Sequence, residues 1–527
     1  MAARLPRRCS RPSPSGPQVT WGFSRIRSQK SPSPQRAAAD SMKLSALLSG
    51  LDFRQSAGAA DPECAGLAYD SRRVTPGMVF FALPGEKTDG HDHAAEAAAH
   101  GAVAVVSRRD CGLPPDVTSV FVDNPRQTLA RAAATFYRQP ANDLKVIGIT
   151  GTNGKTTVAF LVRGILNAVG LRTGMIGTVE YDVGSRTTPA SRTTPESLEL
   201  QQLLTQMRDA NCAACVMEVS SHALEQNRVE AVDFDLGVFT NLTQDHLDYH
   251  GDMETYFASK QKLFEMLGDP LAAVVNLDDD YGSRLMIPGR LSFGFAQDAV
   301  VRAVQCELHG DHTRLVAKTH EGEVELLLSC IGRHNVSNAL AAFAVARSMG
   351  VEPEAIAEAF SALPPPPGRL EAIRCGQSFG VFVDYAHTDD ALHHVLTTLR
   401  ELTRGKLRVM FGCGGNRDAG KRRKMGAAAA ALADDIIITN DNPRHEDPVT
   451  IAEQVAVGCR EARPNDFEIE LDRQRAIDEM LRRARPEDIV LLAGKGHETY
   501  QEIGDVTQPF DDREQARSVL RAMGYED

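Results

Sequence analysis

The segment LKVIGITGTNGKTTVAF, residues 144–160, constrains the fold of this chain more than any other stretch. Val146, Ile147 and Ile149 form a short apolar run typical of a buried strand, and helical spacing follows from Val158. The glycines between them let backbone N–H groups approach an anion, and the start of the helix adds its partial positive charge. Strand, glycine-rich loop and helix in this order predict a phosphate-binding loop.

The loop itself, GTNGKTT at residues 151–157, departs from the common pattern G-x-x-x-x-G-K-[ST], because Ile149 stands where that pattern has a glycine. The alternative interpretation is a glycine turn beside a surface lysine. Because the flanking strand and helix both fit, we favour the phosphate loop. Lys155 would then reach the terminal phosphates, and the Thr156 hydroxyl would be placed for Mg²⁺.

Size and charge bound the remaining possibilities. A chain of 527 residues is too long for one core, and a net charge of −12 argues against a nucleic acid bound through its backbone. The sequence has no run of about 18 apolar residues, which predicts no membrane span. The C-x-x-C at Cys212–Cys215 lies in an apolar setting that favours core cysteines over metal or redox chemistry. We therefore expect a cytoplasmic protein without a nucleic-acid or membrane partner.

Residues 1–41 differ from the rest of the chain. They are rich in Arg, Ser and Pro, and Asp40 is their only acidic residue. Such a basic extension cannot bury enough apolar surface to fold, so we expect it to be disordered. It lacks the apolar core of a secretory signal. Two interpretations stay open, an organellar transit peptide or an extension upstream of a true start at Met42, and we favour the second.

Alternating strand and helix patterns after this extension predict an α/β fold in three domains, residues 42–142, 143–366 and 367–527. In the first domain we expect strands at 79–83, 103–106 and 117–122 and helices at 93–100 and 128–137. In the second we expect further strands at 213–218, 236–240 and 274–277. In the third, beyond the stiff linker at 364–368, we expect strands at 381–385, 407–411, 435–439 and 489–493.

Polar residues follow several of these strands. Glu218 ends one strand of the second domain and His246 follows another, at the sheet edge where a phosphate loop would also lie. Each alone is more often a cap or a surface contact. Together, beside a phosphate loop, they favour Mg²⁺, which takes oxygen ligands and tolerates an imidazole.

All four predicted strands of the third domain end in polar or glycine-rich turns, which favours a second binding crevice. One of these turns contains D-N-P-R at Asp441–Arg444, but the same tetrapeptide occurs at Asp123–Arg126 and therefore proves nothing alone. We interpret the first copy as a turn and cap before a helix, and only the second as part of a crevice.

Eight longer motifs carry a resemblance to a known family: GTNGKTT, EVSSHALEQNR, NLTQDHLDYHG, HNVSNA, PPPPGRLE, VDYAHT, FGCGGNRDAGKR and AGKGHE. In this order, from about Met42 to the C-terminus, they resemble the Mur ligase family. The resemblance implies an N-terminal α/β uridine-nucleotide-binding domain, a central P-loop ATPase-like parallel sheet and a C-terminal Rossmann-like α/β domain that binds an amino acid.

The resemblance also implies an ATP-dependent amide ligase of peptidoglycan synthesis, working as a monomer on small molecules in a bacterial cytoplasm. ATP would phosphorylate the D-glutamate side chain of UDP-N-acetylmuramoyl-L-alanyl-D-glutamate, and an amine of the incoming amino acid would attack the acyl phosphate. Phosphoryl transfer of this kind needs positioning and charge neutralisation. Within the family, the motif at Asp441–Arg444 points to the members that add meso-diaminopimelate.

Carried over onto matching positions, the resemblance implies ATP contacts at Gly151, Thr152, Asn153, Gly154, Lys155, Thr156, Thr157, Asn335, Arg369 and Asp384. The implied catalytic residues are Lys155, Glu218, His246 and Lys260. Thr156 and Glu218 would hold one Mg²⁺. His246 and a carbamylated Lys260 would serve a second, because a carbamate turns a cation into an oxygen ligand. The alternative for Lys260 is an ordinary exposed lysine.

The nucleotide-sugar substrate would contact Tyr69, Ser71, Glu86, Lys87, Thr88, Thr193, Thr194, Ser220, Gln226 and Arg228, while Arg192 stands where some relatives carry asparagine and is left out. Diaminopimelate would contact Arg417, Asp441, Asn442, Pro443, Arg444, Gly494 and Glu498. Arg444 can bind its distal carboxylate in a fork, and Asp441 and Glu498 can meet its ammonium. We expect lysine to be rejected, because a buried Arg444 would be left unpaired.

Three other functions stay open. A lysine-adding ligase would perform the same step, and the motif at Asp441–Arg444 argues against it. A folylpolyglutamate-synthase-like ligase should lack both that motif and the N-terminal uridine site. A non-catalytic relative acting as a partner in plastid transcription complexes is kept open by the basic start of the chain. The presence of Lys155, Glu218, His246 and Lys260 together argues against it.

Overall fold

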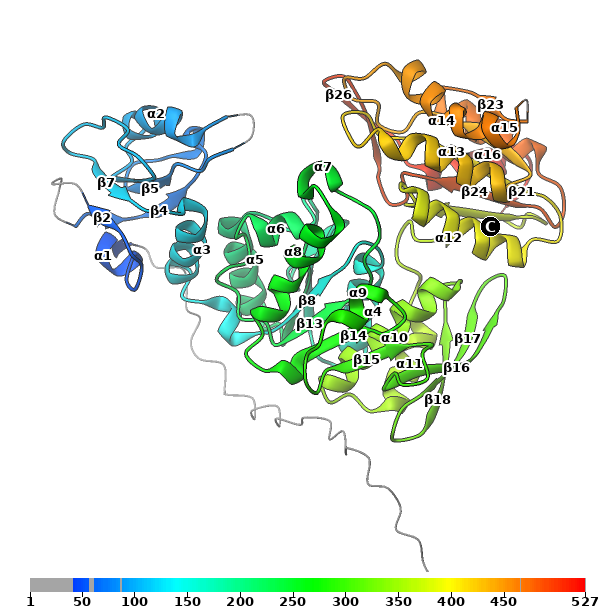
Figure 1. Ribbon diagram of the computed structural model, residues 1–527, viewed down its shortest axis with the longest axis horizontal. Helices are drawn as coiled ribbons and strands as arrows, with labels where there is room; N and C mark the ends of the chain where they lie inside the picture. Colours follow the sequence, from blue (N-terminus) through cyan, green and yellow to red (C-terminus); the bar gives the residue numbers. More distant parts are fainter. Residues whose placement is uncertain (1–40, 56–60, 86–87, 465, 527) are drawn as a thin grey trace, which may run out of the picture.

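The computed structural model describes residues 41–55, 61–85, 88–464 and 466–526. Three α/β units follow one another along the chain and form separate lobes in Figure 1, the first in blue, the second mainly in green and the third in yellow to red. The α/β class expected from the sequence is thereby confirmed. The extension at 1–41 lies outside the described residues except for Ser41, and so do Glu86 and Lys87.

The first unit contains β1 (Met42–Lys43), α1 (Leu44–Leu47), β2 (Arg54–Gln55), β3 (Glu63–Cys64), β4 (Gly66–Ala68), η1 (Ser71–Arg73), β5 (Met78–Phe81), η2 (Gly90–His93), α2 (Ala94–Ala99), β6 (Ala104–Ser107), β7 (Thr118–Phe121) and α3 (Pro125–Phe136). Its main sheet has the order β2-β7-β6-β5-β4, with β4 to β7 parallel. The Asn124 side chain caps α3 by accepting from the N–H groups of Arg126 and Gln127, so the first D-N-P-R copy is indeed a turn and cap.

The second unit contains η3 (Pro140–Asp143), β8 (Lys145–Thr150), α4 (Lys155–Ala168), β9 (Thr173–Ile176), β10 (Glu180–Asp182), β11 (Thr187–Pro189), α5 (Ser197–Asp209), β12 (Ala214–Glu218), α6 (Ser221–Glu225), β13 (Leu236–Phe239), α7 (Leu247–His250), α8 (Met253–Glu265), η4 (Pro270–Ala272), β14 (Ala273–Asn276), α9 (Asp280–Arg284), β15 (Leu291–Gly294), β16 (Val301–Leu308), β17 (Thr313–Lys318), β18 (Glu323–Leu328), α10 (Arg333–Ser348) and α11 (Pro353–Ala362). They form an eleven-stranded sheet in the order β11-β10-β9-β12-β8-β13-β14-β15-β16-β17-β18.

The centre of this sheet, from β9 to β16, is parallel, and antiparallel strands extend both edges. These edge strands were missed from the sequence. The signal was present in β17, whose side chains alternate between buried and exposed positions, the pattern of a half-buried strand. Cys212 and Cys215 are buried free thiols, as the apolar setting of the C-x-x-C predicted.

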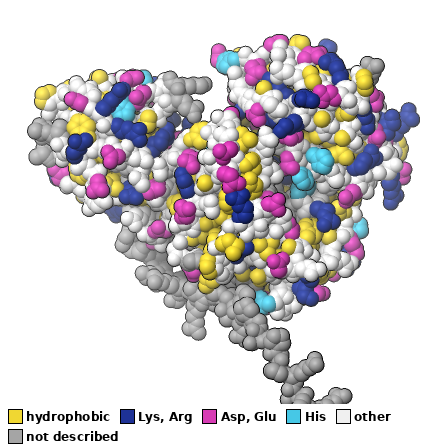
Figure 2. Space-filling view, viewed as in Figure 1, with side chains coloured by type: hydrophobic (Ala, Val, Ile, Leu, Met, Phe, Trp, Pro, Cys, Tyr) yellow, Lys and Arg dark blue, Asp and Glu magenta, His cyan; other side chains and the backbone are white. Residues whose placement is uncertain are grey.

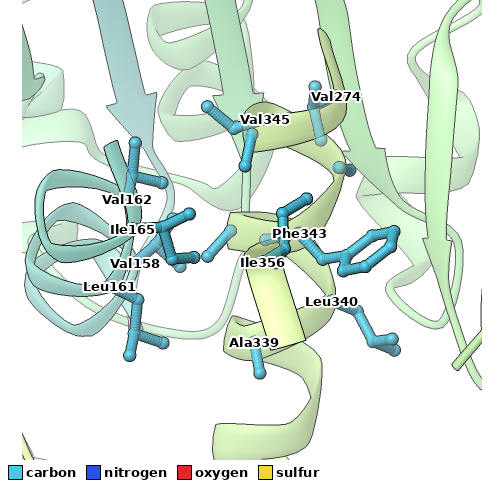
Figure 3. Packing of buried hydrophobic residues seen from close by; sticks show 14 of the residues in the cluster. Val158, Leu161, Val162, Ile165, Val274, Ala339, Leu340, Phe343, Val345 and Ile356 are labelled. Atoms are coloured by element: carbon cyan, nitrogen blue, oxygen red, sulfur yellow. The ribbon is translucent and has the colours of Figure 1, made fainter. Parts of the chain in front are cut away.

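Two helices cover the face of the sheet behind the phosphate loop. Val158, Val162 and Ile165 of α4 pack against the apolar side of α10, which presents Leu340 and Phe343 (Figure 3). All five side chains are buried, so α4 is held in one position relative to β8. The start of α4, which carries Lys155, is thereby held in place as well.

The third unit contains β19 (Glu371–Ala372), β20 (Gly380–Asp384), α12 (Asp389–Leu402), β21 (Leu407–Phe411), α13 (Gly420–Leu432), β22 (Asp435–Ile438), α14 (Pro448–Ala462), β23 (Glu468–Ile469), α15 (Arg473–Arg483), β24 (Ile489–Ala493), β25 (Tyr500–Ile503), β26 (Val506–Pro509) and α16 (Asp512–Ala522). Its main sheet has the order β19-β20-β24-β21-β22-β23. The four strands predicted for this unit are β20, β21, β22 and β24, which run parallel, so their carboxyl ends meet at one edge.

A buried ion pair holds two of these carboxyl ends together. Arg473 on α15 pairs with Asp512 on α16 at 2.6 Å from Nη2 to Oδ2, and both side chains are 0% exposed. The same guanidinium donates to the carbonyls of Asn440 and Ala493, both at 3.0 Å. These carbonyls follow β22 and end β24, so the pair sets the spacing of the two loops that begin there.

On the face drawn in Figure 2, positive and negative side chains are mixed over all three lobes, in keeping with an acidic chain that has no concentrated basic area in that view. Among the helices of the described residues, none is both long and apolar enough to cross a membrane.

We expect Asp512→Ala to lower the free energy of unfolding by roughly 3 kcal/mol, because it leaves the Arg473 charge buried without its partner. Urea unfolding would measure the change. Glu514→Ala on the same helix is the matched control, since its pair with Arg517 is exposed, and it should cost less than about 0.5 kcal/mol. Equal losses in the two variants would contradict this account of the pair.

Candidate active site

The phosphate loop joins β8 to α4 through a backbone that needs glycine at two positions. Gly151 has a φ of +143° and Gly154 a φ of +84°, both in the region that favours glycine. A Cβ at residue 151 would overlap the Thr240 hydroxyl, and a Cβ at residue 154 would overlap the Asn338 side chain. The loop therefore keeps its shape only with these glycines, and the N–H groups at the start of α4 stay open to an anion.

Two lysines bond to the same carbonyl of this loop. Lys155 Nζ donates to Gly151 O at 2.9 Å and to Thr152 O at 2.7 Å, and Lys260 Nζ donates to Gly151 O at 2.8 Å. Lys260 is 1% exposed, so the alternative of an ordinary exposed lysine is wrong. Burial lowers the pKa of both ammonium groups, that of Lys260 well below its usual value, and the neighbouring Lys155 charge adds to this effect.

The Glu218 carboxylate at the end of β12 faces the first turn of α4. It accepts from the Thr156 hydroxyl at 3.0 Å, from the Thr178 N–H at 2.8 Å and from the Thr178 hydroxyl at 3.1 Å. Arg369, from the start of the third unit, donates to the same Thr156 hydroxyl at 3.2 Å. A carboxylate and a hydroxyl beside a phosphate loop are the hard oxygen ligands that Mg²⁺ takes, so this pair fits the ion.

His246 lies beside Lys260, and Tyr256 connects the two. The Tyr256 ring is 4.5 Å from Lys260 Nζ and 6.3 Å from the His246 ring. His246 has a φ of +54° at the start of α7, and its ring packs against His222 at 4.9 Å. Burial lowers the His246 pKa to about 4 although Asp245 opposes the shift, so the imidazole is neutral at pH 7 and can offer a lone pair to a metal.

An unmodified Lys260 does not fit a second metal, because an ammonium and a cation repel each other. Within the described part of the chain, no group of three or more His, Cys, Asp and Glu side chains is arranged to hold a metal ion. The second site therefore fits only if Lys260 gains an oxygen ligand.

The three other residues expected at ATP lie at the junction of the second and third units. Asn335 donates to Ile331 O and accepts from Asn338, so its amide is held within α10. Asp384 accepts from the N–H groups of Leu370 and Ala386, both at 2.7 Å, and burial raises its pKa.

Arg369 lies 4.7 Å from the Tyr385 ring centroid, and its buried Nε has no hydrogen-bond partner in the described structure. A buried guanidinium N–H without an acceptor suits an anionic ligand such as a phosphate. His387 is nearby, and burial lowers its pKa to about 4.

Five of the residues expected at the nucleotide sugar form one hydrogen-bonded group next to Glu218. Thr194 Oγ1 donates to Glu218 O at 2.8 Å and accepts from the Ser220 N–H at 3.0 Å. Arg228 donates to Thr194 O and to Gln226 Oε1, and Thr193 contacts Thr178 at 3.1 Å. The other described members lie on the first unit, where Tyr69 donates to Glu199, Ser71 donates to Glu96 and Thr88 is exposed.

Three arginines converge on one carboxylate where the first and second units meet. Glu196 pairs with Arg192 at 2.6 Å, with Arg228 at 3.1 Å and with Arg126 at 3.4 Å. Arg126 also donates to Pro84 O, next to the loop expected to hold uridine. Sequence reasoning left out Arg126 and Arg192. The first D-N-P-R copy could have indicated Arg126, because an arginine in the first helical turn after a cap can extend its side chain away from the helix.

The residues expected at diaminopimelate lie in the loops after β21, β22 and β24. Asn442 donates to Glu498 at 2.9 Å, and an added Cβ on Gly494, which has a φ of +108°, would lie 2.7 Å from Asp441 Oδ2. Burial and the neighbouring Asp441 raise the Glu498 pKa. Arg417 is exposed, and Pro443 O lies against Gly415.

Lys495 at the centre of these loops was missed from the sequence. It is 0% exposed and donates to Asn442 Oδ1 at 2.9 Å and to Glu498 Oε2 at 3.3 Å, with Asp441 Oδ1 at 3.8 Å. Its charge offsets the two carboxylates that were expected to meet the substrate ammonium. The signal was the motif AGKGHE, in which only the glycine and the glutamate were assigned a contact.

The expectation of a buried Arg444 that lysine would leave unpaired is wrong. Arg444 is 25% exposed and pairs with Glu502 at 2.8 Å from Nε to Oε2. The physical reason is the β25–β26 hairpin, which folds back over the loop and supplies a carboxylate from 58 residues further along the chain. Part of the Arg444 guanidinium is therefore already paired with a carboxylate of the protein itself.

Comparison with known proteins agrees with this geometry. Three family models match in chain order: "Mur ligase family, catalytic domain" at residues 63–137, "Mur ligase middle domain" at 149–346 and "Mur ligase, glutamate ligase domain" at 368–496. Together with the relatives described next, these matches show that the chain belongs to the Mur ligase family.

Two curated relatives are each named UDP-N-acetylmuramoyl-L-alanyl-D-glutamate–2,6-diaminopimelate ligase. The one from Solibacter usitatus is 47% identical over 88% of this chain and 95% of its own, and the one from Geobacter metallireducens is 42% identical over 92% and 99%. A solved structure of the same name is 33% identical over 88% of this chain and 96% of its own, with a TM-score of 0.62. MurF ligase from Thermotoga maritima in complex with ADP, 19% identical over 86% and 97% with a TM-score of 0.58, shares the fold.

We expect Gly151→Ala to weaken ATP binding by roughly 100-fold, because the loop must move away from Thr240 and bear an unfavourable φ. Calorimetric titration with a slowly hydrolysed ATP analogue would measure the affinity. Gly170→Ala is the matched control: Gly170 has a φ of +81° at the end of α4 but no heavy atom within 4 Å of an added Cβ. It should leave affinity unchanged, and a similar loss there would refute the steric explanation.

Two histidines near the junction of the second and third units should titrate far apart. Asp390, which also accepts from Asn153 of the phosphate loop at 3.2 Å, raises the His394 pKa to about 8, whereas burial lowers the His334 pKa to about 4. Because the His394 pKa is raised, its pair stabilises the fold fully below about pH 6.5, and this contribution disappears as the pH rises through 8.

Histidine NMR titration would measure both values. Asp390→Asn should bring the His394 midpoint down towards its ordinary value and leave His334 low. A His394 midpoint that stays near 8 in this variant would show that Asp390 is not the cause.

Proposed function

We propose that this protein is an ATP-dependent amide ligase that adds meso-diaminopimelate to the D-glutamate of UDP-N-acetylmuramoyl-L-alanyl-D-glutamate through an acyl phosphate. One observation carries the proposal. The loops at one edge of the third sheet combine the guanidinium of Arg444 with the carboxylates of Asp441 and Glu498. That charge pattern suits an amino acid with a carboxylate and an ammonium at its far end. The names of the curated relatives support the same substrate.

A carboxylate is a poor electrophile because it has no good leaving group. Transfer of the γ-phosphoryl group of ATP to the carboxylate supplies that leaving group. Attack by the amine can then form an amide and release phosphate. The loop N–H groups and Lys155 would bind the phosphates and spread their charge during transfer. Mg²⁺, held by Thr156 and Glu218, would neutralise phosphate charge when bound.

The Lys155 ammonium already lies within the phosphate loop, where its Nζ donates to two loop carbonyls. A phosphate bound in the loop would compete with these carbonyls for the ammonium. Arg369 would act from the opposite side, because its Nη2 already reaches Thr156 and its Nε lacks an acceptor among the described residues. Asp384 would hold the turn that carries Arg369, through its bond to the Leu370 N–H.

Carbamylation of Lys260 belongs to the proposal. A buried amine with a lowered pKa is more often neutral, and its lone pair can attack CO₂ to form a new N–C bond with loss of a proton. The resulting carbamate would face Lys155, because both amines reach Gly151 O. It would also supply the oxygen ligand that a second Mg²⁺ beside His246 needs.

The nucleotide sugar would span the first and second units. We propose that Tyr69, Ser71 and the 86–88 loop hold uridine, and that Thr193, Thr194, Ser220, Gln226 and Arg228 hold the diphosphate and sugar-peptide. The hydrogen bonds of this second set with each other and with Glu218 O support the assignment, because they join it to the residue proposed to hold Mg²⁺.

Closure of the third unit onto the second is part of the proposed cycle, because ATP and the amino acid are assigned to different units. The polar contacts that now join these units include Asn153 with Asp390 at 3.2 Å and Gln244 with Lys424 at 2.9 Å. Such contacts can be remade as the units rotate, and the 364–368 linker is the candidate hinge. We further propose that the protein works as a monomer in the cytoplasm, and that residues 42–142, 143–366 and 367–527 are its domains.

The deciding experiment follows ADP release by the full chain with Mg²⁺, ATP and UDP-N-acetylmuramoyl-L-alanyl-D-glutamate. Meso-diaminopimelate and L-lysine are added in parallel. We expect turnover with diaminopimelate, and roughly 10-fold lower kcat/KM with lysine, because lysine has no distal carboxylate for Arg444, which stays paired with Glu502 and Gly415. Arg444→Lys should lower kcat/KM for diaminopimelate by roughly 100-fold, because an ammonium cannot form the fork.

The competing functions give different results. Turnover with lysine alone would identify the lysine-adding ligase and refute the assignment of Arg444. Turnover that needs neither amino acid but accepts a folate would identify a folylpolyglutamate-synthase-like enzyme. A folded chain that binds ATP but has no ligase activity would favour the non-catalytic partner. Lys155→Ala, which removes the phosphate-loop ammonium, controls for ADP released by a contaminant.

A further inference from the structure

The β25–β26 hairpin is bonded to the loop after β22 along most of that loop. Gln501 Nε2 donates to Asp441 O at 2.8 Å, and the Glu502 N–H donates to Asn442 Oδ1 at 3.0 Å. The Arg444 N–H donates to Glu502 O at 3.1 Å, and Arg444 O accepts from the Gly504 N–H at 2.8 Å. Two short strands alone are barely stable in water, so hairpin and loop form one structural piece.

Within this piece, the Arg444 guanidinium is held from two sides. Its Nε pairs with Glu502 Oε2 at 2.8 Å, and its Nη1 donates to Gly415 O at 2.9 Å. The backbone of Arg444 adopts a φ of +49°, a conformation that the two main-chain bonds to the hairpin stabilise. Nη2 and the second N–H of Nη1 have no partner among the described residues, so the end of the guanidinium that they form remains for a ligand.

We propose that Glu502 is a positioning residue that holds Arg444 in the orientation needed to bind the distal carboxylate of the amino-acid substrate. This inference rests on the proposed function, because it takes that carboxylate as the ligand of Arg444. A free arginine side chain loses rotamer freedom on binding, and Glu502 removes that freedom before the substrate arrives. Arginine has five N–H donors, so one guanidinium can serve Glu502, Gly415 and a substrate carboxylate together.

An opposite role for Glu502 predicts the opposite result. Its carboxylate could occupy the place of the substrate carboxylate and compete for Arg444, in which case its removal would tighten binding. The contacts favour positioning. Glu502 engages Arg444 through its main chain as well as its side chain, and it uses Nε and leaves Nη2. A competitor that must leave at each turnover would not also be fastened to Asn442 and Arg444 by its backbone.

The test compares KM values in the full chain. We expect Glu502→Ala to raise the KM for diaminopimelate roughly ten-fold with kcat changed less than about two-fold, because the orientation of Arg444 is lost and the chemical step is untouched. Glu502→Gln should raise it less, since its amide oxygen can still contact the Arg444 guanidinium while only the charge is lost. The KM values for ATP and for the nucleotide sugar should stay unchanged, which a misfolded third unit would not allow.

Glu325→Ala is the matched control. Glu325 makes a similar pair with Arg314, at 2.6 Å from Nε to Oε1, across the exposed β17–β18 hairpin of the second unit. It should leave every KM unchanged. A KM for diaminopimelate that is unchanged or lower in Glu502→Ala would overturn the inference.

A double variant separates this inference from the proposed function. In an Arg444→Lys background, Glu502→Ala should have no further effect on the KM for diaminopimelate, because the two residues act as one unit. If Glu502→Ala raises the KM for diaminopimelate as much in the Arg444→Lys background as in the native chain, Glu502 acts elsewhere. That result would overturn the inference. If Arg444→Lys raises that KM and Glu502→Ala does not, this inference alone fails. If neither changes it, the assignment of Arg444 in the proposed function fails as well.

Discussion

The shape of the phosphate loop depends on the loop that follows the neighbouring strand β13. The N–H of Thr152 donates to Asn241 O and the N–H of Asn153 donates to Asn241 Oδ1, both at 2.9 Å. In return, Thr240 Oγ1 donates to Asn153 O at 2.6 Å. Because these three hydrogen bonds use the side of the loop nearest β13, the N–H groups at the start of α4 stay available to an anion. The position of Thr240 also explains why residue 151 tolerates no side chain, since Thr240 fills the space beside it.

Several buried charges lie where this protein is expected to bind ligands or to hold ligand loops. Lys155 and Lys260 share one carbonyl, Lys495 lies among Asp441 and Glu498, and Arg473 with Asp512 ties two strand ends together. Burying a charge costs several kcal/mol even when it is paired. An apolar replacement would often stabilise the fold as well or better, so burial of these particular charges is consistent with a role in binding. The two lysines at Gly151 are the clearest case, because like charges placed together are unfavourable without an anion between them.

The junctions between the three units are polar. The first unit meets the second through pairs such as Arg126 with Glu196 and Arg131 with Glu230, and the second meets the third through Asn153 with Asp390. Figure 2 shows the molecule hollowed between the first and third lobes, above the second. Polar junctions of this kind are weak compared with an apolar core and let whole units move. Substrates that are assigned to different units can then meet only when those units approach each other.

The sequence by itself determined the α/β class, the phosphate loop, half of the strands of the three main sheets and the loops that carry the candidate site, because each rests on a local pattern of apolar periodicity, glycine and caps. It did not determine which side chains meet. Thr156 and Glu218 are 62 residues apart, and Lys260 reaches Gly151 across 109 residues. Glu502 went unnoticed because it meets Arg444 only when the β25–β26 hairpin folds back over the loop after β22. Lys495 went unnoticed because it meets Asn442 only when the loops after β22 and β24 lie at the same edge of the sheet. Local patterns specify the backbone, whereas contacts between distant segments depend on how strands are ordered in the sheet, and only the tertiary structure decides that order.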